Sequence, residues 1–105
     1  GALNLKGLNM TSFSSDQLVA HATADGQMVP ATQRARITSI QAAGVASSVV
    51  KFYNGTGTGA GNVLVAEYKF NTEGLEVYVP GSGILFDAGV YIDLTNTTGV
   101  TITFT

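Results

Sequence analysis

The chain has 105 residues, only 11% of them charged, with a formal net charge of −2, and no cysteine. This length allows one domain with one modest core, and the absence of cysteine excludes disulfides, thiolate nucleophiles and cysteine-based zinc sites. The charge balance gives no attraction to nucleic acid, and no apolar stretch is long enough to cross a bilayer, so we expect neither a nucleic-acid nor a membrane partner.

The first 15 residues are apolar but do not alternate. Glycine and asparagine separate five large apolar residues, which are Leu3, Leu5, Leu8, Met10 and Phe13. Such a segment is either a first strand or an N-terminal arm that docks on a neighbouring subunit. We therefore divide the chain into residues 1–15, the arm or first strand, and residues 16–105, a single β-sandwich domain.

Residues 17–23 have the composition of a strand, and the turn dipeptide Asp25 and Gly26 follows. Residues 31–42 predict a long strand whose apolar positions change phase midway, which a bulge near Thr38 would explain. A helix is the competing interpretation, because some apolar residues are three apart. We favour a strand, rich in β-branched residues, that ends at Gly44.

Two further strands, 48–53 and 62–71, flank a glycine-rich loop and predict a hairpin. A phosphate-binding loop would need a helix after it, whereas a strand pattern follows here. In the second strand, alternation places Leu64, Ala66, Tyr68 and Phe70 on one face. The opposite face then carries Val63, Val65, Glu67 and Lys69.

The last third contains four apolar runs with period two, 75–79, 84–87, 90–95 and 100–105, each bounded by turn residues. Such runs are half-buried strands with one face on a core. The whole chain then has about eight strands and no helix. We expect an all-β fold, an antiparallel β-sandwich with a possible jelly-roll topology.

No catalytic constellation stands out. His21 is the only histidine, so a usual zinc site cannot be completed. Two carboxylate pairs, Asp87 with Asp93 and Glu73 with Glu76, have residue types that suit a glycosidase or, for the first pair, a calcium ion. Neither pair lies in a recognisable motif, so we expect no enzyme, no metal and no cofactor.

Three tyrosines, Tyr53, Tyr78 and Tyr91, fall on the outward phase of their strands. Adjacent tyrosines can form a carbohydrate-binding platform or a subunit interface, where tyrosine is enriched. We favour an interface and an oligomer, most simply a trimer. The candidate interface residues are Leu3, Leu5, Leu8, Met10, Tyr53, Val63, Val65, Tyr78 and Tyr91.

A strand ending in Tyr53 and a glycine-rich turn precede a second run, made of Pro80, Gly81, Ser82, Gly83, Ile84, Phe86, Gly89, Val90, Tyr91, Asp93, Leu94 and Thr95. On these residues the chain, from about Arg36 to Thr105, resembles small virion structural proteins of tailed bacteriophages, of the head decoration or cement type. The resemblance implies a non-enzymatic subunit without cofactor, bound to the major capsid protein or other virion proteins on the capsid exterior. It leaves open a carbohydrate-binding module of a tail or fibre.

Overall fold

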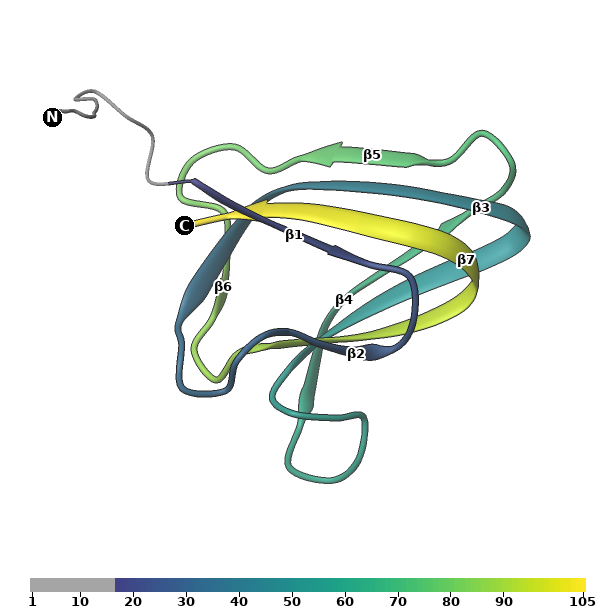
Figure 1. The fold of residues 1–105 in the computed structure, drawn as a ribbon. Coiled ribbons are helices and arrows are strands. Elements are labelled where there is room, and N and C mark those ends of the chain that lie inside the picture. The colour runs from purple at the N-terminus through teal and green to yellow at the C-terminus, as the bar shows by residue number, and fades with distance from the viewer. Residues whose placement is uncertain (1–16) are drawn as a thin grey trace, which may run out of the picture.

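The computed structural model describes residues 17–105, and every regular element among them is a β-strand. The seven strands of this part form one antiparallel sheet (Figure 1). In chain order they are β1 (Leu18–Ala22), β2 (Gly26–Val29), β3 (Ala35–Asn54), β4 (Val63–Phe70), β5 (Leu75–Tyr78), β6 (Ile84–Phe86) and β7 (Val90–Phe104). The all-β prediction is therefore confirmed, with seven strands in this part in place of about eight.

Two long strands, β3 and β7, form the middle of the sheet and pair with each other over most of their length. On its other side β7 pairs with β2 and β1, whereas β3 pairs with β6, β5 and β4. Both long strands bend, so the sheet folds back on itself (Figure 1). We call the two parts the β1 half, with β1, β5 and β6 at its margins, and the β4 half, with β2 and β4 at its margins.

The bend is held by Ser48, which is fully buried in β3. Its hydroxyl accepts a hydrogen bond from the Val45 amide at 3.0 Å and lies 2.6 Å and 2.5 Å from the carbonyl oxygens of Val45 and Asn96. Ser47 on β3 and Asn96 on β7 both adopt the left-handed conformation, with φ of 62° and 53°. The side chain of Asn96 also donates to the Ser47 carbonyl at 3.2 Å, so the two strands turn together.

Gly44 lies inside this bend. A methyl group at this position would press on the Ser48 hydroxyl and come within 2.8 Å of the Asn96 carbonyl oxygen. The prediction that a strand ends at Gly44 is therefore wrong, since β3 continues through it to Asn54. The division of the last two apolar runs is wrong for the same reason, because β7 also continues through its bend.

One core lies between the two halves. Phe52 of the β4 half and Phe86 of the β1 half meet edge to face, with ring centroids 6.5 Å apart. The alternation predicted for the last third is confirmed, because nearly all of its inward positions are buried or packed on this core. The folded sheet is consistent with the predicted sandwich, although both layers belong to one continuous sheet. The buried apolar residues are Val29, Ala35, Ile37, Ile40, Val50, Phe52, Phe70, Phe86, Val90, Ile92, Val100, Ile102 and Phe104.

The bulge expected near Thr38 is confirmed, because the register of β3 against β7 shifts between Ile37 and Ser39. It brings Ile37 and Ile40, which have opposite parity, onto the same buried face. The predicted arm, with Leu3, Leu5, Leu8 and Met10, lies outside the described residues and stays a prediction.

Ser48→Ala should destabilise the fold by about 1–3 kcal/mol, because the bend loses a fully buried hydroxyl that bonds the Val45 amide and the carbonyl oxygens of Val45 and Asn96. The measurement is chemical denaturation. Ser82→Ala, at an exposed position between β5 and β6, removes the same hydroxyl from the surface and is the matched control. Equal stabilities of the two variants would contradict the role of the Ser48 hydroxyl.

Phe86→Ala should cost about 3–5 kcal/mol, as expected for a large ring removed from a packed core. Leu85→Ala, one residue earlier on β6, changes a side chain that is 39% exposed and should cost much less. Unfolding free energies of the two variants check the strand phase. A larger loss for Leu85→Ala would mean that β6 presents the other face to the core.

Candidate interaction surface

The outward face of the β4 half carries two adjacent tyrosines. Tyr91 on β7 lies opposite Tyr53 on β3, and Tyr53 lies opposite Leu64 on β4. The flanking residues Phe52 and Ile92 are buried, so alternation turns both tyrosines away from the core. We call Tyr91, Tyr53 and Leu64 the tyrosine row, which crosses three strands.

The tyrosine row includes Leu64 because β4 has an irregular register here. Phe52 pairs with Ala66 and Tyr53 with Leu64, so Val65 is an extra residue. The prediction that Leu64 shares a face with Ala66 is therefore wrong, and Leu64 is 43% exposed. Val63 and Val65 are also exposed, at 60% and 38%. These three residues form an apolar end of β4 beside Tyr53.

A second row on the same face is charged. Asp93 on β7, Lys51 on β3 and Glu67 on β4 lie opposite one another in that order. Opposite charges on neighbouring strands stabilise such a pairing modestly. Lys69, two residues after Glu67 on β4, lies 3.9 Å from the Glu67 carboxylate and its side chain is 76% exposed. This exposed ion pair contributes little stability. We call Asp93, Lys51 and Glu67 the charge row.

Asp93 has a second acidic neighbour, Asp25, in the turn between β1 and β2. Burial raises the pKa of the Asp93 carboxyl, and the charge of Asp25 and a side-chain hydrogen bond to it raise that pKa further, against the opposing effect of Lys51. Asp25 itself accepts a hydrogen bond from the Leu94 amide at 2.7 Å. The surroundings of Asp93 therefore disfavour its ionised form.

Gln27 fixes the strand beside the tyrosine row. Gln27 belongs to β2 and lies opposite Tyr91 of β7. Its side-chain nitrogen lies within 3.0 Å of the carbonyl oxygens of Val29, Gly55 and Val90. Asn54 links the end of β3 to the turn before β7, since it donates to Asp87 at 2.8 Å and accepts from the Ala88 amide at 2.8 Å. These contacts hold the row's end of the sheet in place.

The third candidate tyrosine lies elsewhere. Tyr78 is on β5, opposite Ser39 at the margin of the β1 half, and is 70% exposed. Its hydroxyl donates to Glu76 at 3.2 Å. The structure therefore brings Tyr53 and Tyr91 together, with Val63 and Val65 on the neighbouring strand, but leaves Tyr78 on a different part of the surface.

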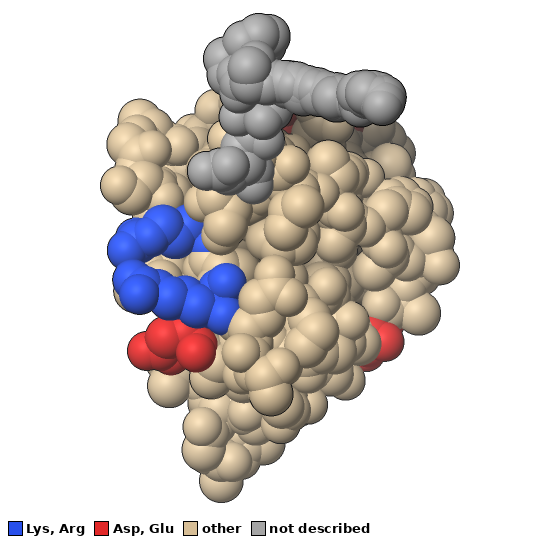
Figure 2. Space-filling model, turned by 60° about the vertical axis from the view of Figure 1, so that its left-hand side comes forward, with Lys and Arg blue, Asp and Glu red and all other residues tan. Residues whose placement is uncertain are grey.

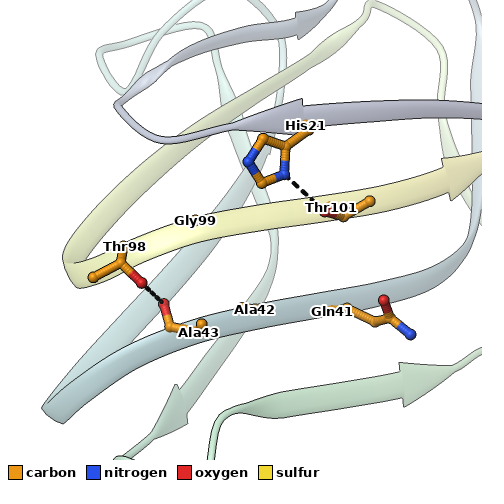
Figure 3. A pocket seen from close by; sticks show the side chains of 7 residues that line it. All are labelled: His21, Gln41, Ala42, Ala43, Thr98, Gly99 and Thr101. Carbon is orange, nitrogen blue, oxygen red and sulfur yellow. Dashed lines mark hydrogen bonds between the residues drawn. The ribbon is translucent and has the colours of Figure 1, made fainter.

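His21 lines a shallow depression on the outward face of the β1 half (Figure 3). Its ring nitrogen Nδ1 lies 2.8 Å from the Thr101 hydroxyl, and the ring lies over Gly99, where a methyl group would come within 3.2 Å of it. Gln41 and Thr98 complete the polar lining. The depression offers hydroxyl and amide groups but no carboxylate, so it has no general acid or base besides His21.

The two aspartates that the sequence suggested as a pair, Asp87 and Asp93, have different partners in the structure. Asp87 accepts its hydrogen bond from Asn54, whereas Asp93 lies opposite Lys51 and beside Asp25. Among residues 17–105 no group of three or more His, Cys, Asp or Glu side chains is placed to hold a metal ion. The same part of the chain contains no helix able to span a membrane.

The glycine-rich loop, residues 55–62, connects β3 to β4 as a hairpin, as predicted. Asn62 closes it, because its side-chain oxygen accepts from the Thr56 amide at 2.9 Å and its backbone amide donates to the Gly59 carbonyl at 3.2 Å. Strand β4 follows directly, which does not provide the helix N-terminus of a phosphate-binding loop.

Charged side chains cover little of the surface seen in Figure 2, where a small basic group beside an acidic one is the main exception. A comparison with protein-family models, with curated proteins and with solved structures found no match. The sequence pattern identified the two tyrosines and Val65 of this surface, whereas Val63 pairs with Asn54 and lies on the opposite side of β4 from Leu64. It missed Leu64 and the charge row, whose membership depends on the register between strands.

Asp93→Asn should stabilise the protein at pH 7 and have little effect near pH 3. A raised folded-state pKa means that stability associated with this group is present at low pH and is lost as pH rises through that pKa. The check is the pH dependence of the unfolding midpoint. Asp87→Asn removes the same formal charge where Asn54 donates to the carboxylate, and it serves as the control. Destabilisation by Asp93→Asn at pH 7 would show that the pairing with Lys51 dominates.

Proposed function

We propose that this chain is a non-enzymatic structural protein of a tailed-phage virion. It binds the exterior of the capsid, through contacts with the major capsid protein or other virion proteins and with its own copies, and a trimer is the simplest assembly. The tyrosine row carries the proposal, because it places two half-buried aromatic rings and an exposed leucine side by side on an outward face. Tyrosine is among the residues most enriched at protein interfaces.

Two further features support this function. The first is the resemblance of the segment from about Arg36 to Thr105 to phage decoration proteins, which rests on the run from Pro80 to Thr95. The second is the low charge of the chain, 11% of its residues, since a surface of uncharged polar groups is easily covered by partners.

A carbohydrate-binding module of a phage tail or fibre is the alternative. The observation that favours it is the same adjacency of Tyr53 and Tyr91, since stacked sugar rings need neighbouring aromatic side chains. The absence of tryptophan weakens this alternative. A glycan array separates the two functions, because a structural subunit should bind none of the sugars.

The test of the main proposal is whether the chain co-purifies with intact particles of the phage that encodes it, and where it lies on them. The double variant Tyr53→Ala with Tyr91→Ala should lower particle occupancy by about tenfold or more, as for two interface residues that each contribute over 1 kcal/mol. Tyr78→Ala, on a different part of the surface, is the matched control. Thermal unfolding of each variant shows that the subunit remains folded.

Three outcomes would overturn the proposal. The first is a particle that lacks the chain. The second is full occupancy by the folded double variant. The third is a strong glycan signal that is lost in the same double variant, which would favour the carbohydrate-binding module.

A further inference from the structure

Strand β4 is an open edge of the sheet. It pairs with β3 on one side, and no other strand among residues 17–105 pairs with it on the other. An edge of eight residues leaves a row of amide and carbonyl groups that can pair with another chain. Its apolar end, with Val63, Leu64 and Val65 exposed, makes this edge a candidate contact surface.

The charges on β4 would ordinarily discourage such pairing, because a lysine on an edge strand repels most partners. Glu67 and Lys69, however, have opposite signs and lie two residues apart, so they share one face of the strand. A strand with this pattern is complementary to itself when it is reversed. The partner that satisfies both charges is therefore a second copy of the same strand in antiparallel orientation.

Two antiparallel copies of β4 would be related by a two-fold axis, and these charges determine which residue lies at that axis. An axis at Tyr68 places Glu67 opposite Lys69 of the partner subunit, and Lys69 opposite Glu67 of the partner subunit. An axis at Glu67 would place the two glutamates opposite each other, which is destabilising. An axis at Ala66 would leave both charges opposite valines. The register centred on Tyr68 is the one that forms two attractive pairs.

The inward face of β4 fits the same register. Tyr68 is half-buried and meets Phe52 edge to face, with ring centroids 6.2 Å apart. At the axis the two Tyr68 rings would cover each other's remaining exposed surface, and Ala66 would lie opposite Phe70 of the partner subunit. A small side chain opposite a large one is compatible with close packing across the contact.

We propose that two copies of this chain associate through their β4 edges, antiparallel and centred on Tyr68, so that the β4 halves form one continuous sheet. This contact rests on the edge and its charges and does not depend on binding to a capsid. It is isologous and joins two copies, so the proposed trimer would use other surfaces and could be linked to further trimers by it. The tyrosine row stays on the outward face of the extended sheet.

Charge reversal tests the register with the full-length chain. In analytical ultracentrifugation we expect a reversible dimer of the unmodified protein. Glu67→Lys and Lys69→Glu alone should each weaken it by about tenfold, because two attractive pairs become repulsive. The double variant should restore dimerisation. Arg34→Glu, at an exposed position outside the strands, repeats the charge change of Lys69→Glu and is the control.

The decisive measurement is a mixture of the two single variants. One chain then carries two lysines at these positions and the other two glutamates, so the proposed register predicts that the mixture forms the heterodimer in preference to either homodimer. Such rescue cannot arise from an effect of either substitution on the fold of one chain. A monomer at high micromolar concentration, an assembly insensitive to the single reversals, or a mixture without heterodimer would each overturn the proposal. Particle binding by the Tyr53 and Tyr91 variants is a separate readout, so the two proposals can fail independently.

Discussion

The fold depends on the bend where β3 and β7 turn together, and that bend depends on one buried hydroxyl. Ser48 satisfies the amide of Val45 and reaches carbonyl oxygens on both strands. A backbone that leaves regular pairing inside a protein must find other partners, because an unpaired buried amide or carbonyl is costly. Gly44 leaves room for this hydroxyl. Loss of these contacts would therefore destabilise the bend that closes the sheet over its core.

The bend also decides which surfaces the molecule presents. Because the same two strands pass through both halves, the inward face of each half closes over the single core, and each outward face is left for other contacts. The two outward faces differ in chemistry. The β1 half presents a shallow depression lined by His21 and by hydroxyl and amide groups, whereas the β4 half presents aromatic and charged rows side by side. The second face therefore combines the residues that give contact area with those that give orientation.

Much of this could be predicted from the sequence, because period-two alternation depends on local pattern alone. It identified the inward residues of the last third, the bulge near Thr38 and the outward tyrosines. It failed where a non-local contact decides the outcome. A glycine such as Gly44 ordinarily predicts the end of a strand. Its role in the bend becomes visible only from its close approach to the distant Asn96. Leu64 has inward parity, and only its pairing with Tyr53 reveals the shift that exposes it. The pairing of Tyr53 with Tyr91 likewise required the register.

A subunit that coats a shell needs more than one kind of contact, since an isologous pair by itself closes at two copies. The geometry of the β4 half separates two kinds. Edge pairing would use the backbone of β4 and the charges of Glu67 and Lys69, whereas the tyrosine row reaches Tyr91 on β7, two strands away from that edge. Side chains on a face stand roughly perpendicular to the backbone groups at an edge, so occupying one leaves the other open. In the proposed assembly the same half would contact a second copy through its edge and a different protein through its face, and such a combination would allow a coat to extend beyond a pair.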